Sequence, residues 1–217
     1  MTIPPISDSG LPLVDFLKES TWALHTEAEK TGVVADIIRQ RVVMKGYLNF
    51  IHNLIEVYKA LESETAWLSN YAPLQKLFTP ALHRHKQLEH DYEKLLSLNA
   101  EIPSDKIHAE TRNYCEHIRH SQKHVPVAML AHIYVRYLGD LNGGQVLRRL
   151  LKSSLGLSDD SLTFYAFPDI NDLADFRTNF RETLNKTIVT ETERQSAKQA
   201  AMDAFKFNIA LSKACQS

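Results

Sequence analysis

Glycines gather in one stretch of the sequence that otherwise has the pattern of a helix. Three of the chain's seven glycines, Gly139, Gly143 and Gly144, fall there together. A glycine inside a helix costs about 0.5–1 kcal/mol relative to alanine, so the cluster needs a reason. Gly139 and Gly143 share one helix face, which leaves that face bare and lets a broad, flat ligand lie against the backbone. A close helix–helix crossing uses the same spacing, and the glycines alone leave both interpretations open.

Polar residues surround the glycine cluster. Asp140 stands between the glycines, Arg136 lies one turn before it, and Tyr134 and Tyr137 are close by. Aspartate is unfavourable inside a helix, so Asp140 is either a surface charge paired with Arg136 or a functional group beside the bare face. A close helix crossing has no need of a carboxylate. The neighbours therefore favour a helix that faces a ligand.

A histidine near the start of the chain has the spacing of a metal ligand. His25 lies one turn before Glu29, and a carboxylate that accepts from Nδ1 leaves Nε2 free to bind a metal. Taken alone, such a histidine is more often an ordinary core or surface residue. Lys18 lies about 10 Å away on the same face, at 1.5 Å per residue. Arg177 and Arg181 could bind carboxylates together or be ordinary solvated charges.

The hydrophobic pattern predicts an all-α protein. Apolar residues recur every three or four positions, and alternation with period two is nearly absent. Breaks fall at Gly32, Pro73, Pro80, Pro103, Pro126, Gly156 and Pro168. The pattern predicts helices at 12–30, 43–69, 83–98, 105–121, 126–155, 170–187 and 190–213. We expect a flexible N-terminus at 1–10 and one domain at 11–213.

Composition excludes several classes of function. The chain has 217 residues and a net charge of −1, which does not favour nucleic acid as a partner. Cys115 and Cys215 lack metal-ligand spacing, and Cys215 falls in a C-terminal end that we expect to be frayed, so both read as free thiols in a reducing compartment. We see no secretion signal and no apolar run of about 18 residues, and we expect a soluble cytoplasmic protein without a membrane anchor.

Several segments carry a resemblance to a known family. They are Leu17–Glu29, Val57–Glu62, Leu82–Arg84, Leu88–Asp91, Ala131–Gln145, Phe164–Pro168, Phe176–Arg177, Phe180–Arg181 and Ala204–Asn208. The run Tyr-Leu-Gly-Asp-Leu-Asn-Gly-Gly-Gln, residues 137–145, is long and specific. In these segments the chain resembles the heme oxygenases, and the likeness extends from about Leu17 to Leu211. It implies an all-α, single-domain fold in which heme lies between a proximal helix and a kinked distal helix.

The resemblance implies a role for each matching residue. His25 would be the ligand of the heme iron, with Glu29 as its partner. Gly139 and Gly143 would be where the distal helix kinks and presses its backbone onto the other heme face, with Gly144 completing the opening. The residues implied in a distal water network are Asp140, Tyr58, Tyr114, Arg136 and Asn208. The residues implied in holding the heme propionates are Lys18, Tyr134, Arg177 and Arg181, with arginine at 177 where lysine is common.

The resemblance also implies an activity. Heme b would be both cofactor and substrate, and O2 would cleave it to biliverdin, CO and Fe²⁺, by default at the α carbon. Electrons would come from a reductase or ferredoxin, because the chain has no nucleotide-binding fingerprint. Arg148, Arg149 and Lys152 either form a basic face for that partner or are a solvated helix face. We expect a monomer of the soluble type, because no hydrophobic C-terminal tail is present.

Three other classes of protein fit the sequence less well. A di-iron carboxylate protein needs Glu-x-x-His motifs, and no glutamate here has a histidine three residues on. A heme carrier or sensor of the same fold would use His25 and the propionate residues equally well, but it would have no use for a proton-delivery network around Asp140. A bare helical interaction module would explain neither the glycines nor their polar neighbours.

Overall fold

The computed structural model describes residues 10–63, 66–102, 106–187 and 190–216. In these ranges every regular element is helical, which confirms the all-α prediction. The predicted flexible segment 1–10 lies outside them except for Gly10. The longer helices are α1 (Leu13–Lys30), α2 (Gly32–Ile38), α3 (Met44–Ser63), α5 (His85–Leu98), α6 (Ala109–His124), α7 (Pro126–Ile133), α8 (Gly139–Leu155), α9 (Leu173–Thr187) and α10 (Glu191–Ala214).

Most predicted helices are confirmed, with shifts at their ends. The predicted helix 43–69 is shorter, because α3 ends at Ser63 and Ala66–Asn70 form a separate 3-10 turn. The sequence pattern missed α2, which is too short for a clear helical period, and also the one-turn helix α4 (Ala72–Gln75). The predicted helix 126–155 is present as α7, a π-helical turn at Tyr134–Leu138, and α8.

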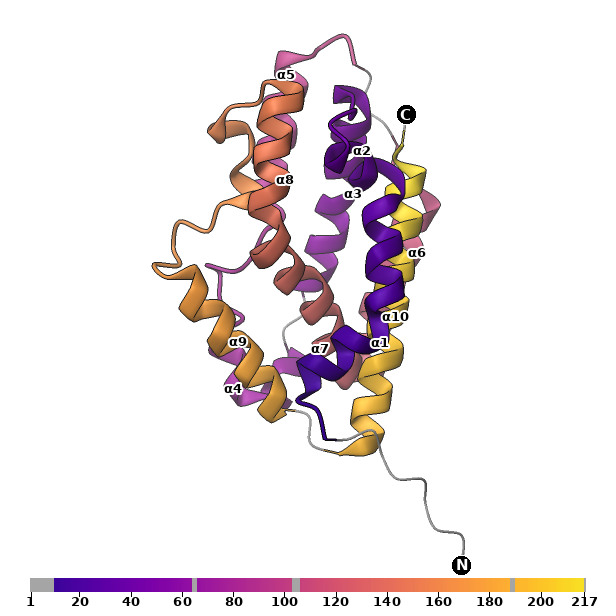
Figure 1. Cartoon of the computed structure of the whole chain (residues 1–217), viewed down its shortest axis with the longest axis vertical. Coiled ribbons are helices and arrows are strands. Elements are labelled where there is room, and N and C mark those ends of the chain that lie inside the picture. Colours follow the sequence, from indigo (N-terminus) through magenta and orange to yellow (C-terminus); the bar gives the residue numbers. More distant parts are fainter. Residues whose placement is uncertain (1–9, 64–65, 103–105, 188–189, 217) are drawn as a thin grey trace, which may run out of the picture.

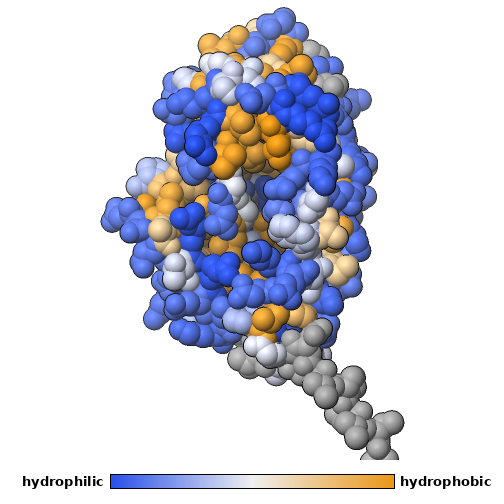
Figure 2. All heavy atoms as spheres, viewed as in Figure 1, coloured by the Kyte–Doolittle hydropathy of each residue, from blue (hydrophilic) through white to orange (hydrophobic). Residues whose placement is uncertain are grey.

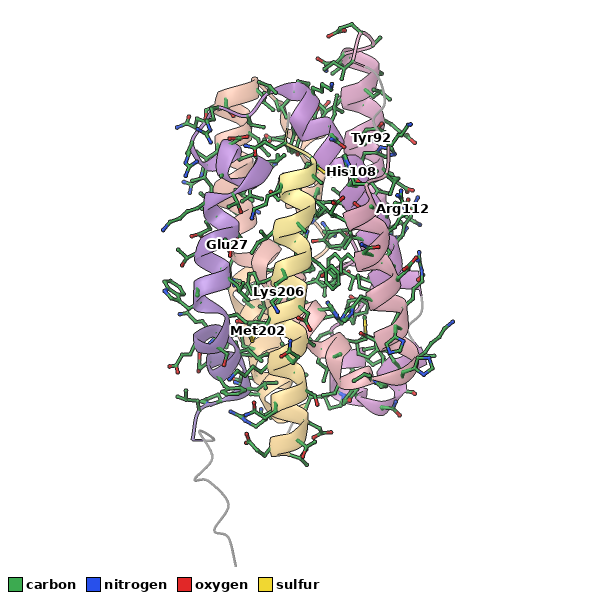
Figure 3. The ribbon with its side chains drawn as sticks, turned by 90° about the vertical axis from the view of Figure 1, so that its right-hand side faces the viewer. Glu27, Tyr92, His108, Arg112, Met202 and Lys206 are labelled. Atoms are coloured by element: carbon green, nitrogen blue, oxygen red, sulfur yellow. The ribbon has the colours of Figure 1, made fainter. Side chains whose placement is uncertain are left out.

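Helices α1 and α10 lie side by side and form one flank of the molecule (Figure 1). At the start of α10, Thr190 and Glu193 form a capping box that satisfies otherwise free backbone N–H groups. Figure 3 shows α10 lying between α1 and α6. Small side chains, Ala197, Ala201 and Ala204, are fully buried on α10, so neighbouring helices can approach it closely.

A glycine sets the turn between α1 and α2. Gly32 has φ +62°, and a Cβ there would lie 2.3 Å from the carbonyl carbon of Ser212 on α10. Only glycine avoids both the strained backbone and the clash. The backbone N–H of Val34 donates to Ser212 Oγ at 3.2 Å. The end of α1 and the start of α2 are therefore fixed against the C-terminal part of α10.

The long helical segment opposite α1 consists of α7, the π turn and α8, and it begins at a proline and ends at a glycine. Pro126 occupies the first turn of α7, and Gly156 ends α8 with φ +66°. The π turn, Tyr134–Leu138, ends directly before Gly139, and Gly139 and Gly143 lie in the first two turns of α8. A π turn holds one extra residue, so it changes which side chains face the interior.

The C-terminus is better held than the sequence suggested. Cys215, expected in a frayed end, is fully buried. Its Sγ lies 3.8 Å from the carbonyl oxygen of Asn49 on α3. Cys115 is buried as well, and burial raises the pKa of its thiol to about 11. Neither cysteine forms a disulfide in the described part of the chain.

Candidate functional site

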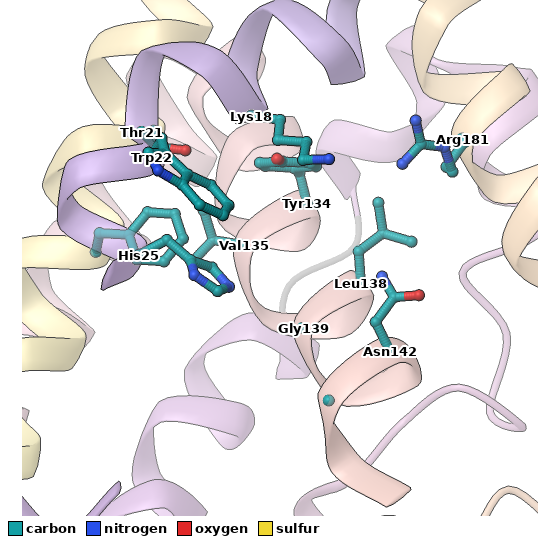
Figure 4. A pocket seen from close by; sticks show the side chains of 12 residues that line it. Lys18, Thr21, Trp22, His25, Tyr134, Val135, Leu138, Gly139, Asn142 and Arg181 are labelled. Atoms are coloured by element: carbon teal, nitrogen blue, oxygen red, sulfur yellow. The ribbon is translucent and has the colours of Figure 1, made fainter. Parts of the chain in front are cut away.

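A cavity of about 390 Å³ opens between α1 and the helix formed by the π turn and α8. One side is lined by His25 and Trp22, and the other by the backbone at Gly139 and Gly143 (Figure 4). A second cavity of about 330 Å³ shares His25 and both glycines and continues toward α2 and α3. Figure 2 shows the hollow on this face, with hydrophobic residues above it. His25, Gly139 and Gly143, singled out from the sequence, therefore meet in one place.

The α1 side of the cavity, called the proximal wall below, offers an available histidine. The His25 side chain is 48% exposed, and its Nδ1 lies 3.8 Å from Glu29 Oε1. That separation is too long for a hydrogen bond, so the expected bond between these two residues is not formed here. The Trp22 and Phe205 rings flank the imidazole. His25 is placed to bind a ligand with a ring nitrogen.

The opposite side, the distal wall, is bare backbone at two glycines, with side chains such as Leu138 and Asn142 beside them. Nothing lies within 4 Å of a Cβ built at Gly139 or Gly143, and both residues are exposed to the cavity. A close helix crossing would have filled that space, so the crossing interpretation is wrong. Gly144 differs, because its Cβ would meet the Tyr165 ring at 3.3 Å. Gly144 makes room for the Tyr165 side chain, and it also lines the second cavity.

Asp140 is held from behind the bare backbone. The hydroxyl of Tyr58 donates to Asp140 Oδ2. Arg136 does not pair with Asp140 as a surface charge would; it donates from Nη2 to the Tyr58 oxygen at 2.8 Å. Its Nη1 donates to Asn208 Oδ1 at 2.8 Å. The polar residues implied by the resemblance thus form one connected group.

Tyr114 completes this distal network. It is fully buried, which raises the pKa of its hydroxyl, while the nearby Arg136 and Asn208 lower that pKa. Its hydroxyl also lies 3.4 Å from His132 Nδ1. Burial lowers the pKa of His132 to about 3, so the imidazole is neutral at physiological pH. Five residues implied by the resemblance, Asp140, Tyr58, Arg136, Asn208 and Tyr114, lie together.

Burial and neighbouring charges shift the pKa values of the ionisable residues in the distal network. It raises the pKa of Asp140 to about 6, even though Arg136 and the Tyr58 hydroxyl lower it. Burial alone would lower the pKa of Arg136, but Tyr58 and Asp140 outweigh it and raise that pKa. The carboxyl can therefore exchange a proton near neutral pH, while the guanidinium stays charged.

A cationic end of the cavity lies beyond His25. Figure 4 shows Lys18, Tyr134 and Arg181 there, and all three line the cavity. Arg181 Nη2 also pairs with Asp15 Oδ1 at 2.9 Å. Arg177, expected in the same group, is not among the lining residues; it donates from Nε to the carbonyl oxygen of Leu173 at 3.1 Å. The implied clamp is therefore only partly assembled.

Two residues of the possible basic face beyond the glycines share one acidic partner. Arg148 Nη2 and Lys152 Nζ lie 2.7 and 3.0 Å from Asp159 Oδ1. Of the three basic residues singled out from the sequence, only Arg149 has no acidic partner in the described part of the chain. The three basic residues therefore outnumber their one acidic partner, and the face keeps a positive charge.

Sequence reasoning missed three aromatic residues of the site, Trp22, Phe205 and Tyr165. Trp22 and Phe205 flank His25, and Tyr165 packs on Gly144. Tyr165 is positioned by buried groups on and beside α5. Asp91 accepts from the backbone N–H groups of Thr163 and Phe164 at 2.9 Å each, and the buried Arg84 stacks on Phe167. The spacing of Trp22 three residues before His25 was the one signal available for it.

Comparison with known proteins decides the family. The family model for heme oxygenase matches residues 11–214. The chain belongs to the heme oxygenase family. It is 32% identical over 199 residues to heme oxygenase 1 of Synechocystis sp., covering 91% of this chain and 82% of the relative. It is 33% identical over 205 residues to a heme oxygenase of Takifugu rubripes, covering 94% and 74%.

Solved structures support the same assignment. The crystal structure of heme oxygenase-1 from Synechocystis sp. in complex with heme aligns with a TM-score of 0.85 and 30% identity, covering 94% of this chain and 92% of that one. A heme oxygenase from Leptospira interrogans aligns with a TM-score of 0.84 and 28% identity, covering 94% and 100%. The fold is the all-α heme oxygenase fold, and the enzyme cleaves heme to biliverdin. No helix in the described ranges has the length and hydropathy needed to span a bilayer.

Proposed function

We propose that the enzyme binds heme b between His25 and the bare backbone at Gly139 and Gly143, and cleaves it with O2 to biliverdin, CO and Fe²⁺. The observation that carries the proposal is the cavity between these walls, on whose glycine side a Cβ at either residue would have no atom within 4 Å. A flat macrocycle fits against such a surface. When bound, heme supplies both the iron that activates O2 and the ring that is cleaved.

His25 would bind the iron through Nε2. The exposed imidazole, with Glu29 as the nearest carboxylate, supports this role. Lys18, Tyr134 and Arg181 would bind the propionates, because they line the end of the cavity beyond His25. Arg177 would contribute only if its side chain left the main-chain carbonyls it now contacts.

Asp140 would hold a water molecule and pass a proton toward the reacting oxygen. Tyr58 and Arg136 keep its carboxyl in place, and a pKa of about 6 suits a group that gives and regains a proton near neutral pH. Gly139 and Gly143 would bring the backbone itself up to the heme, and this would limit the room for O2. Tyr114 and Asn208 would support this arrangement from behind.

Electrons would come from a separate reductase or ferredoxin. The basic residues at the cavity, Lys18 and Arg181, support an acidic partner because they lie where the proposed heme would bind. We expect the enzyme to act as a cytoplasmic monomer, on the basis of its composition and free thiols.

A direct experiment tests the proposal. Heme is added to the purified protein without oxygen, and O2 and a reductant are then supplied while the absorption spectrum is recorded. We expect the Soret band to give way to a bilin spectrum, with CO released. Heme that stays intact through this treatment would instead support a carrier or sensor.

A further inference from the structure

The ring of Trp22 is exposed beside the candidate iron ligand. Its relative exposure of 59% is the largest among the large apolar side chains on α1, and it lines the cavity. Trp22 and His25 are three residues apart on α1 and so lie on the same helix face. Their ring centroids are 5.8 Å apart, and the ring planes differ by 1°. The indole is stacked parallel to the imidazole (Figure 4).

No hydrogen bond fixes the His25 ring in the described part of the chain. Glu29, the nearest carboxylate, is 3.8 Å from Nδ1. Histidine ligands are usually oriented by a hydrogen bond from the second ring nitrogen. Here the close neighbours of the ring are Trp22 and Phe205. The Phe205 ring meets the imidazole edge-on, with ring centroids 5.9 Å apart and an angle of 66° between the ring planes. Aromatic contacts therefore take the place that a hydrogen bond usually has.

The stacked Trp22 ring can restrict how the His25 imidazole turns. An imidazole binds a metal with a lone pair that lies in the ring plane, so the ring can still turn about the nitrogen–metal axis. A planar neighbour parallel to the ring allows one orientation and opposes the others. We propose that Trp22 is a positioning residue that fixes the rotation of the His25 imidazole about its bond to the iron. This inference rests on the proposed role of His25.

Substitutions at position 22 separate planarity from bulk. Trp22→Leu keeps an apolar side chain but removes the flat ring, and Trp22→Phe keeps a smaller flat ring. Because Trp22 is exposed, neither change should affect folding, which circular dichroism checks. Trp67 is 4% exposed and does not line the cavity, so Trp67→Phe is the matched control.

The first measurement needs no heme. Proton NMR of the heme-free protein records the His25 ring signals, assigned by their absence in His25→Ala. A stacked indole shifts these signals by its ring current. We expect the shift to be lost in Trp22→Leu, reduced in Trp22→Phe and unchanged in Trp67→Phe. His25 signals that are the same in Trp22→Leu and the wild type would overturn the stack and the proposal with it.

The second measurement uses the ferric heme complex with cyanide. Its EPR g values and heme-methyl NMR shifts depend on the orientation of the axial imidazole. We expect Trp22→Leu to change both, Trp22→Phe to change them less, and Trp67→Phe to leave them as in the wild type. If His25→Ala alters these spectra but Trp22→Leu does not, only the positioning proposal fails. If His25→Ala leaves them unchanged, the proposed role of His25 fails, and the positioning proposal fails with it.

Discussion

On the proximal wall, His25 is an exposed ring with no hydrogen bond in reach, whereas on the distal wall Asp140 is held by Tyr58 and, through it, by Arg136. The proximal wall presents the His25 and Trp22 rings to the cavity, whereas the distal wall presents bare backbone at Gly139 and Gly143. A residue that binds a metal must keep its lone pair available, but a residue that passes a proton must stand at a fixed place. The contrast teaches that the two walls carry different tasks and should respond differently to mutation.

A large effect should come from removing the proximal ligand. We expect His25→Ala to lower the rate of biliverdin formation by on the order of 10²-fold or more, because the iron loses its axial nitrogen. Much of the heme affinity should remain, since the cavity walls and the cationic end are unchanged. Added imidazole should restore part of the rate. Turnover at the wild-type rate without imidazole would show that His25 is not the ligand.

Replacement by alanine should change the free energy of unfolding in opposite directions at Gly32 and at Gly143. Gly32→Ala should lower the free energy of unfolding by about 2–4 kcal/mol, because its Cβ would clash with Ser212 and its φ is +62°. Gly143→Ala should raise that free energy by about 0.5–1 kcal/mol in the heme-free protein, because the Cβ meets nothing and alanine favours helix. Gly143→Ala should nevertheless weaken heme binding. Denaturant unfolding and heme titration test both, and unweakened heme binding would show that the bare backbone does not contact heme.

The Asp140 carboxyl should make the free energy of unfolding depend on pH. The pKa of Asp140 is raised from 3.8 to about 6, so the folded protein binds more protons than the unfolded chain in that window. Its contribution is therefore fully present below the lower value and is lost as pH rises through the upper one, by up to about 3 kcal/mol. The unfolding free energy of the wild type minus that of Asp140→Asn should fall between pH 4 and 7. A flat difference would mean that Asp140 has an ordinary pKa.

The smallest effect should come from the cationic end. Arg181→Gln should weaken heme binding by about 3- to 10-fold, because Arg181 lines the cavity and one charged contact is lost. Arg177→Gln, four residues earlier on α9, is the matched comparison and should change the affinity by less than about 2-fold. Equal losses in the two variants would restore the two-arginine clamp implied by the resemblance.

The parts of the site that depend on local spacing could be predicted from the sequence. His25 and Lys18 share a face of one helix, and Gly139 and Gly143 share a face of another, so helix geometry alone relates each pair. Asp140 was singled out because aspartate is unfavourable inside a helix.

The rest depends on contacts between distant segments. Gly144 makes room for the Tyr165 ring. The Arg177 side chain is held by its hydrogen bond to the main-chain carbonyl of Leu173. Neither partner can be read from the local pattern. The π turn before Gly139 was missed because one extra residue hardly alters the hydrophobic period. Trp22 was missed because an exposed aromatic residue carries no pattern of its own.

The central claim is that the distal wall delivers a proton through Asp140, and one variant tests it most directly. Asp140→Ala is loaded with heme, and biliverdin formation is measured beside peroxide-dependent oxidation of a phenolic dye. We expect heme binding as in the wild type, a fall in biliverdin formation of about 10²–10⁴-fold, and a gain in dye oxidation, with Asp140→Asn in between because an amide can still orient water. Biliverdin formation at the wild-type rate, without dye oxidation, would contradict the account and leave Gly139 and Gly143 acting by shape alone.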